Sequence, residues 1–310
     1  MSNNRAGRSR RRGRPAGFRG RLLGGRATIA AHHNRGHAVT SFVDKLDAAA
    51  KRNRSLLVVG LDPWRPSMPV NDIGTFTKAI VDATADLVCA FKPNSAFYEA
   101  EGIEGMRALE ATMKAIPSHI PVILDAKRGD IGNTAQAYAK AAFEIWGADA
   151  TTVNAWGGRD SVEPFLAYRD KGIFIWVRSS NPGGAEFQSL PVHGETPLYE
   201  YMTREAQSWN QAGNVGLVVG ATAPGELAHV RALCPTMPLL IPGVGAQGGD
   251  LEASVRNGMD GRGRRALINA SRQVIYAAKG AGFAEAARDA ATRLRDAIGT
   301  ARGEGSGFAW

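Results

Sequence analysis

The sequence predicts an α/β protein of the (β/α)8 TIM-barrel class, preceded by a disordered arginine-rich extension. Eight short apolar runs recur between residues 55 and 271. Segments with helical spacing separate these runs, and ionisable side chains stand directly after several of them. Together these observations favour a barrel of parallel strands with a functional site at the carboxyl ends of the strands.

Each apolar run is interpreted as one strand. The runs are short, continuous rather than alternating, and rich in valine, isoleucine and leucine, which is typical of parallel strands buried on both faces. They span residues 55–62, 86–94, 120–128, 150–158, 172–181, 215–222, 237–245 and 265–271. Between them, segments such as 133–147 and 196–213 have the composition and spacing of helices. Eight successive strand–helix units match the barrel.

A glycine-rich motif raises an alternative fold. The stretch "GVGAQG" fits the G-x-G-x-x-G pattern at Gly243, Gly245 and Gly248, which would suit an open, doubly wound dinucleotide-binding sheet. That fingerprint also requires an acidic residue at the end of the next strand, whereas the next run ends in "NAS". We therefore expect only a local anion site, because the loops after strands seven and eight of a barrel often bind phosphate.

Positive charge is concentrated at the N-terminus. The net charge is +9, but residues 1–43 contain ten arginines and no lysine or acid, which leaves −1 on residues 44–310. A segment of this composition cannot bury enough apolar surface to fold alone. Three interpretations stay open for it: a nucleic-acid-binding arm, a targeting peptide, or a solvated extension without a role. We expect a disordered extension over 1–40, the barrel over 41–300 and a flexible tail over 301–310.

The composition argues against several other classes of protein. No run reaches the roughly 18 apolar residues of a membrane span, and no secretory signal is recognisable, so a cytoplasmic protein is expected. Cys89 and Cys234 have neither CxxC nor Cys/His spacing, which predicts buried thiols rather than a disulfide or a zinc site. The histidines lack HxH and HExxH spacing, so no metal is expected.

Five ionisable side chains follow three successive predicted strands. Asp62 ends the first run and Lys92 ends the second, while Asp125, Lys127 and Asp130 follow the third. Asp125 and Lys127 are two residues apart and should project to the same side of the strand. Salt bridges on the rim, each worth about 0 to 1 kcal/mol, are the simplest explanation for one such pair. For three neighbouring strands, convergence at the carboxyl mouth of a barrel favours an active site.

Five motifs in order carry a resemblance to a known family. They are "GLDP" (60–63), "FKPN" (91–94), "DAKRGDIGNTA" (125–135), "SNPG" (180–183) and "PGVGAQGGD" (242–250). From about residue 40 to about residue 298, the chain resembles orotidine 5'-phosphate decarboxylase, in particular its longer bacterial group. The resemblance implies conversion of orotidine 5'-phosphate to UMP, the last step of de novo pyrimidine synthesis, without a metal or an organic cofactor.

The same resemblance implies roles for individual residues. It implies an alternating Lys-Asp-Lys-Asp network of Lys92, Asp125, Lys127 and Asp130, with Lys127 as the proton donor. It further implies a homodimer with shared active sites, in which Asp130, Ile131 and Thr134 reach into the partner's site. The implied substrate ligands are Asp62 and Lys92 for the ribose, Ser180 for the pyrimidine, and Gln247 and Arg272 for the phosphate. The segment 243–249 would close over the phosphate.

The expected chemistry agrees with these residue types. Loss of CO2 from C6 of the pyrimidine leaves a carbanion without an adjacent carbonyl to delocalise it, so preorganised charge has to stabilise it. Lys127 can supply that charge and then the proton, while Asp125 would repel the substrate carboxylate, a ground-state effect that is contested in general. Two lysines and two aspartates sum to zero charge, which limits the cost of burying them.

A second enzyme class within the same barrel is kept as an alternative. Magnesium-dependent sugar-phosphate lyases and decarboxylases also carry D-x-K-x-x-D but use the acids to hold metal. Lys92 argues against that class, because an ammonium there would compete with Mg2+ for the same carboxylates.

Two segments depart from the family pattern. "VNAWGG" (153–158) follows the fourth strand where a Pro-Tyr-Met-Gly sequence is expected, which affects the shape of that loop. "DGRGRR" (260–265) resembles an insertion and is expected to be a solvated basic turn. Trp156, Trp176 and Trp209 are expected to pack between the helices and the sheet rather than to contact a ligand.

Overall fold

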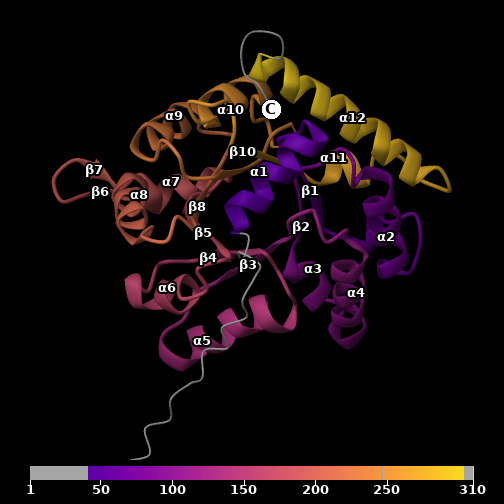
Figure 1. Ribbon diagram of the computed structural model, residues 1–310, viewed down its shortest axis with the longest axis horizontal. Coiled ribbons are helices and arrows are strands. Elements are labelled where there is room, and N and C mark those ends of the chain that lie inside the picture. Colours follow the sequence, from indigo (N-terminus) through magenta and orange to yellow (C-terminus); the bar gives the residue numbers. More distant parts are fainter. Residues whose placement is uncertain (1–40, 246, 304–309) are drawn as a thin grey trace, which may run out of the picture. The chain divides into compact units, whose positions relative to one another are not determined.

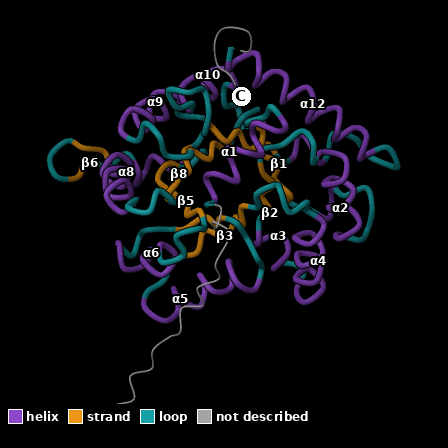
Figure 2. The backbone as a smooth tube through the Cα atoms, in the orientation of Figure 1, coloured by secondary structure: helices purple, strands orange, loops and turns teal. Residues whose placement is uncertain are grey.

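Eight parallel strands form a closed barrel at the centre of the fold, drawn in orange in Figure 2. The computed structural model describes residues 41–245, 247–303 and 310. The barrel strands are β1 (Leu57–Leu61), β2 (Ala90–Pro93), β3 (Ile123–Arg128), β4 (Ala150–Val153), β5 (Gly172–Arg178), β8 (Val215–Val219), β9 (Leu239–Pro242) and β10 (Ala266–Ala270). Their order in the sheet is β2-β1-β10-β9-β8-β5-β4-β3, and the isolated parallel bridges Phe91–Val122 and Asn94–Asp125 join β2 to β3.

The predicted barrel is confirmed, because each of the eight predicted runs contains one of these strands. Every residue of β1, β4, β8 and β10 is buried, as expected for strands covered on both faces. The expected basic extension over 1–40 and residues 304–309 of the expected tail lie outside the described residues. In the part of the chain that is described, no helix is long and apolar enough to cross a membrane.

Helices surround the barrel as an outer layer (Figure 1). The longer ones are α2 (Ile73–Thr84), α4 (Gly102–Ala115), α5 (Gly132–Lys140), α6 (Arg159–Leu166), α8 (Leu198–Trp209), α9 (Pro224–Leu233), α10 (Leu251–Gly258) and α12 (Phe283–Arg302). Short turns of helix are α3 (Ser95–Glu99), α7 (Ala185–Gln188), α11 (Arg272–Ile275), η1 (Arg65–Ser67), η3 (Pro182–Gly184) and the π-helical turn η2 (Ala141–Ile145). The helices predicted over 133–147 and 196–213 are present as α5 with η2 and as α8.

The helix α1 (Phe42–Asn53) contacts the segments that precede β4, β5 and β10 and so covers the amino ends of these strands. Its N-cap is Ser41, whose hydroxyl accepts a hydrogen bond from the backbone N–H of Asp44. Phe42 packs edge-on against Phe174, with ring centroids 5.7 Å apart. Lys45 pairs with Asp149 just before β4, at 2.7 Å. The amino end of the barrel is therefore filled, which leaves the carboxyl end for a site.

A small antiparallel hairpin, β6 (Pro191–Val192) with β7 (Thr196–Pro197), interrupts the connection between β5 and α8. No pattern in the sequence predicts this hairpin. Strands of two residues carry no period-2 pattern, and a proline in each of them argues against a strand.

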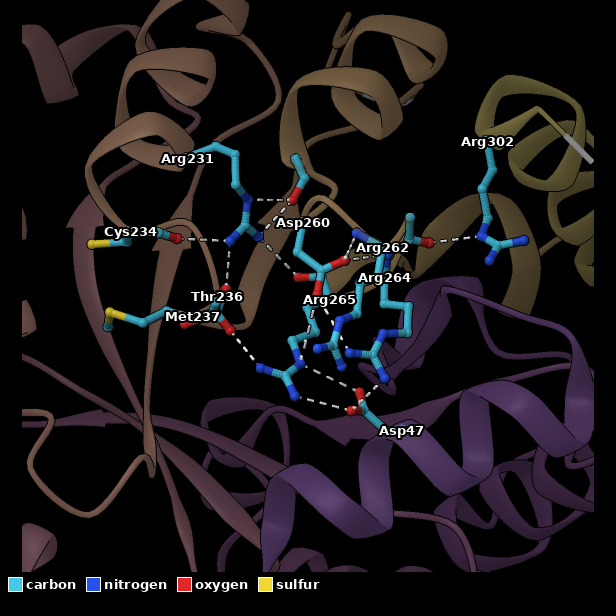
Figure 3. A network of polar contacts seen from close by, with 12 residues as sticks. Asp47, Arg231, Cys234, Thr236, Met237, Asp260, Arg262, Arg264, Arg265 and Arg302 are labelled. Atoms are coloured by element: carbon cyan, nitrogen blue, oxygen red, sulfur yellow. Dashed lines mark hydrogen bonds and ion pairs between the residues drawn. The ribbon is translucent and has the colours of Figure 1, made fainter. Parts of the chain in front are cut away.

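The turn over 260–265 belongs to a network of charged side chains, shown in Figure 3 and called here the arginine cluster: Arg231, Arg264 and Arg265 with Asp47 and Asp260. Asp47 on α1 pairs with Arg264 at 3.1 Å and with Arg265 at 3.0 Å. Asp260 is buried and accepts the backbone N–H of Arg264 at 2.8 Å. The expected solvated basic turn is thus wrong: the turn is partly buried because α1 supplies a carboxylate from a distant part of the sequence.

Candidate active site

Three charged side chains meet where β2 and β3 end, and we call them the Lys–Asp–Lys triad: Lys92, Asp125 and Lys127. Lys92 lies in β2, and its Nζ is 2.7 Å from Oδ2 of Asp125. Lys127 lies in β3, and its Nζ is 2.6 Å from Oδ1 of the same carboxylate. One carboxylate therefore bridges two ammonium groups. Asp62, which follows β1, lies close enough to Lys92 to contribute to its charge balance.

The two lysines differ in how far their side chains are buried. The side chains of Lys92 and Asp125 are 4% and 8% exposed, whereas that of Lys127 is 36% exposed. Burial opposes the ammonium of Lys92, but the carboxylates of Asp125 and Asp62 outweigh it and hold the pKa of Lys92 above its ordinary value. Burial likewise opposes ionisation of Asp125, yet Lys92 and Lys127 keep its pKa well below the usual range. Lys92 and Asp125 are therefore both ionised, and Lys127 is the member that reaches open space.

A cavity of about 570 Å3 opens at the carboxyl ends of the strands. This volume is in the range of sites for small organic ligands. Its polar lining consists of Asp62, Ser67, Lys92, Asn94, Asp125, Lys127, Thr152, Ser179, Ser180, Asn181, Gln247, Asn269, Ser271, Arg272 and Gln273, together with Tyr276. The structure thus brings Asp62, Lys92, Asp125, Lys127, Ser180, Gln247 and Arg272, all named from the sequence, to the wall of one cavity.

Three buried polar atoms on this wall have no hydrogen-bond partner in the described chain. They are Oδ1 of Asp62, Oδ1 of Asn269 and Nε2 of Gln273. A buried polar group without a partner costs about 1 to 3 kcal/mol. On this wall, therefore, two acceptors and one donor of the described chain are left unsatisfied.

The glycine-rich loop lies on the same wall. Gly243 has φ +100°, and a Cβ there would lie 2.8 Å from Oε1 of Gln247 and 2.9 Å from Cβ of Ser180, so only glycine fits. The backbone N–H of Gly249 donates to the carbonyl of Gly243 at 3.1 Å and makes a tight turn. Ala246 lies outside the described residues. Gln247, Ser180 and Arg272 all line this cavity.

Three predicted residues are not on this cavity. Asp130 turns its Oδ1 to the backbone N–H of Ile131, at 2.8 Å. The side chain of Ile131 is 61% exposed, and Thr134 is exposed in the first turn of α5. None of the three lines the cavity of its own chain.

Several residues on the wall were missed by the sequence analysis. Thr152 donates to Oδ1 of Asp125 at 2.9 Å, but a threonine within a buried strand carries no signal of its own. Asn269 is a polar residue at the end of an apolar run, a signal that could have been used. The expectation that Trp176 packs away from any ligand is wrong: it lines the cavity, with the Lys127 ammonium 6.0 Å from its ring centroid. Trp156 is also misplaced, because it is 73% exposed.

The prediction of buried thiols is confirmed. Cys89 and Cys234 are free and buried, and burial raises the pKa of Cys89 to about 12 and that of Cys234 to about 11. Within the described residues, no group of three or more histidine, cysteine, aspartate or glutamate side chains could hold a metal ion.

Comparisons with known proteins agree on one family. The model of the family described as "Orotidine 5'-phosphate decarboxylase / HUMPS family" matches residues 55–287. The orotidine 5'-phosphate decarboxylase of Roseiflexus castenholzii is 53% identical over 268 residues, which cover 84% of this chain and 98% of that protein. The enzyme of the same name from Paracidovorax citrulli is 53% identical over 274 residues, covering 85% and 100%.

Solved structures give the same result. The structure of Leishmania donovani OMP decarboxylase superimposes with a TM-score of 0.77 at 43% identity, covering 85% of this chain and 99% of that one. The structure of Leishmania donovani UMP synthase gives a TM-score of 0.78 at 45% identity, covering 85% of this chain and 57% of that one.

Proposed function

This chain belongs to the orotidine 5'-phosphate decarboxylase family, and on that premise we propose that Lys92, Asp125, Lys127 and Asp130 perform its reaction. The enzyme is a carboxy-lyase that converts orotidine 5'-phosphate to UMP in pyrimidine biosynthesis. The observation that carries the assignment of residues is the Lys–Asp–Lys triad, which stands at the wall of a cavity with Lys127 turned toward the opening.

The proposed binding mode uses the polar wall of the cavity. The phosphate binds to Arg272, Gln247 and the amides of the glycine-rich turn, the ribose hydroxyls to Asp62 and Lys92, and the pyrimidine to Ser180. The Oδ1 of Asp62 supports the ribose assignment, because Asp62 lines the cavity and this oxygen has no hydrogen-bond partner within the described chain. Binding energy from the phosphate, which is remote from C6, can hold the glycine-rich turn closed and organise the reacting centre.

The proposed chemistry takes place at C6. The bond between C6 and the carboxylate breaks, CO2 leaves, and the electron pair stays on C6. The ammonium of Lys127 stabilises that pair and then donates a proton to it, which gives UMP, and Lys127 regains its proton from solvent. Asp125 cannot accept that proton easily, because two ammonium groups depress its pKa. No metal or organic cofactor takes part in this scheme.

Lys92 has a different role in this scheme. It is almost fully buried and pairs with Oδ2 of Asp125, whereas Lys127 pairs with Oδ1. The Asp125 carboxylate is therefore fixed on both oxygens and stays charged beside the carboxylate of the substrate. Departure of CO2 relieves the repulsion between the two carboxylates.

We further propose a homodimer that shares its active sites. Asp130, Ile131 and Thr134 do not line the cavity of their own chain. Ile131 is 61% exposed and Trp156 is 73% exposed, and a Cβ placed on Gly157, next to Trp156, would lie 3.8 Å from Cγ2 of Ile131. Large exposed apolar side chains that adjoin one another favour a protein interface. In the proposed dimer this surface is covered, and Asp130 completes the charge-neutral network of the partner's site.

The magnesium-dependent alternative is weaker on geometric grounds. Both oxygens of Asp125 contact ammonium groups, so a Mg2+ ion would have to displace Lys92 or Lys127. Turnover that persists in EDTA is expected for the decarboxylase, and loss of turnover in EDTA would favour the alternative. Because substrate and product are charged nucleotides that cross membranes poorly, we propose that the enzyme works in the cytoplasm.

The proposal is tested by following the ultraviolet absorbance of orotidine 5'-phosphate with the wild-type protein and Lys127→Ala. Wild-type protein is expected to consume the substrate with or without EDTA. Lys127→Ala is expected to fold normally. Its kcat should fall by about 10^2- to 10^4-fold, the contribution typical of a general acid. Lys114→Ala is the matched control, because Lys114 is an exposed lysine on α4. Near-normal turnover by Lys127→Ala would refute the assignment of the proton donor.

A further inference from the structure

The strand that carries Asp125 and Lys127 is irregular at these residues. In the pairing of β3 with β4, Leu124 is opposite Thr151 and Arg128 is opposite Val153. Three residues of β3, 125 to 127, therefore face the single residue 152 of β4. Bulges of this kind redirect side chains and often occur beside active sites.

The backbone of Lys127 is strained at this bulge. Its φ is +45°, in the left-handed region that a side chain with a Cβ disfavours. Three other described non-glycine residues have positive φ, namely Arg54, His193 and Arg265. Arg54 follows a helix, His193 lies in the β6–β7 turn, and Arg265 precedes β10, so Lys127 is the one that lies inside a described strand. Such a conformation persists only where its surroundings hold it.

One hydroxyl group meets both ends of the bulge. Oγ1 of Thr152 accepts a hydrogen bond from the backbone N–H of Lys127 at 2.9 Å. The same hydroxyl donates to Oδ1 of Asp125, also at 2.9 Å. Thr152 is 1% exposed, and its β-branched side chain has little freedom about χ1. A hydroxyl has one proton to donate, so this one is fully used by Asp125.

At this bulge, a side chain rather than a backbone carbonyl of a neighbouring strand is the partner of the Lys127 N–H. That side chain is Thr152, whose Oγ1 accepts the hydrogen bond. Without the hydroxyl, the N–H of Lys127 would lose its partner at this position, and a buried backbone donor rarely stays unpaired. The strand would then relax toward a regular conformation, which moves the Lys127 side chain.

We propose that Thr152 is a positioning residue: its hydroxyl holds Lys127 in the left-handed conformation and orients the Asp125 carboxylate, so that the Lys127 ammonium faces C6 of the substrate. This inference rests on the proposed function, because it assumes that Lys127 is the proton donor. It assigns to Thr152 no direct contact with the substrate.

The test compares two adjacent threonines of β4. Thr152→Val keeps the shape and the β-branch but removes the hydroxyl. Thr151→Val is the matched control: Thr151 is also buried, and its hydroxyl donates at 2.9 Å to the carbonyl of Leu124, which is not a catalytic group. Both variants lose one buried hydroxyl in the same strand, so both are expected to lower the melting temperature to a similar extent.

Only Thr152→Val is expected to change catalysis. Its kcat should fall about 10- to 100-fold, as for a reacting group displaced by about 1 Å, with KM for orotidine 5'-phosphate unchanged. Thr151→Val should keep the wild-type kcat. Thr152→Ser restores the hydroxyl and should recover most of the lost kcat, and Thr152→Ala, which introduces no methyl group in place of the hydroxyl, should lose as much as Thr152→Val.

The proposal is overturned if Thr152→Val or Thr152→Ala turns over like Thr151→Val, if the loss appears in KM alone, or if Thr152→Ser is as impaired as Thr152→Val. Wild-type protein and Lys127→Ala are assayed alongside. Absence of turnover by the wild type, or near-normal turnover by Lys127→Ala, would refute the proposed function instead. If the wild type is active, Lys127→Ala is inactive and Thr152→Val is normal, only the inference about Thr152 fails.

Discussion

Two clusters of buried charge lie at opposite ends of the same barrel, and they differ in how their donors are used. At the carboxyl end, Lys92 and Lys127 share one carboxylate beside a cavity. At the amino end, Arg231 donates to the carbonyls of Gly258, Cys234 and Met237, at 2.6 to 2.9 Å (Figure 3). In the first cluster, the ammonium of Lys127 lies at the wall of the cavity. In the second, the guanidinium of Arg231 joins loops through hydrogen bonds.

The difference shows that buried charge alone does not identify an active site. The arginine cluster fastens the turns before β9 and β10 to α1, so its charge supports the fold. The triad lies beside unpartnered polar atoms of Asp62 and Asn269, so its surroundings are left incomplete until a ligand binds. A buried polar group without a hydrogen-bond partner lowers the stability of the folded protein. Such groups are therefore retained where they serve a function.

Among the changes that compare the two clusters, replacing the shared carboxylate should produce the largest effect. Asp125→Asn removes the charge that both lysines contact, and we expect kcat to fall by about 10^2- to 10^3-fold, comparable to the loss of a preorganised electrostatic group. The variant leaves Lys92 buried without its carboxylate, which should also lower the free energy of unfolding by about 3 kcal/mol. Steady-state turnover and urea unfolding measure the two effects. Wild-type kcat in this variant would contradict the role of the triad.

Replacing the central arginine of the other cluster should affect stability alone. Arg231→Met leaves the carbonyls of Gly258, Cys234 and Met237 without their donor, and we expect a loss of about 3 kcal/mol in the free energy of unfolding. The kcat and KM of the folded variant should stay at wild-type values. A large fall in kcat at a temperature where the variant is fully folded would mean that the two ends of the barrel are coupled.

The pH dependence of stability should separate the triad from ordinary carboxylates. The pKa of Asp125 is depressed in the folded state relative to its ordinary value of 3.8. Its contribution is therefore fully present above about pH 4 to 5 and is lost as the pH falls through the folded pKa. The difference in unfolding free energy between wild type and Asp125→Asn should shrink when urea unfolding is moved from pH 7 to pH 3. A difference that is constant with pH would exclude the depressed pKa.

The smallest effect is expected at the rim of the arginine cluster. Asp47→Ala breaks the contacts to Arg264 and Arg265, whose side chains are 25% and 20% exposed. Partly exposed ion pairs contribute little, so we expect a loss of about 1 kcal/mol in stability and no change in turnover. Thermal unfolding, measured without added salt and in 1 M salt, where the Debye length is about 3 Å, checks this small electrostatic contribution. A loss as large as that of Arg231→Met would show that the buried and rim contacts are equivalent.

The fold was largely predictable, because burial on both faces imposes a simple pattern. Continuous apolar runs such as those of β1 and β8 are typical of strands in a covered parallel sheet or of short buried helices. The number and spacing of the runs favour the barrel over the other folds. Residues at the carboxyl ends of strands, such as Lys92 and Asp125, could be placed at one mouth on the same basis.

The remaining features depend on contacts between distant segments. The partial burial of Arg264 depends on Asp47, which is more than 200 residues away in sequence. The left-handed conformation of Lys127 depends on Thr152 in the neighbouring strand, and a lysine gives no local sign of positive φ, as a glycine would. A tryptophan in an apolar run predicts a place in the core, because large aromatic residues usually pack there, whereas Trp176 in β5 lines the cavity.

The central claim, a site built on Lys127 and completed by Asp130 of a second chain, is tested most directly by mixing two inactive variants. Lys127→Ala and Asp130→Ala are each expected to have very low activity alone. Unfolded and refolded together in equal amounts, half of the dimers formed at random contain one chain of each kind, and each of these has one intact site, so about a quarter of wild-type activity should return. A mixture as inactive as its components, or full activity of Asp130→Ala alone, would contradict the shared site.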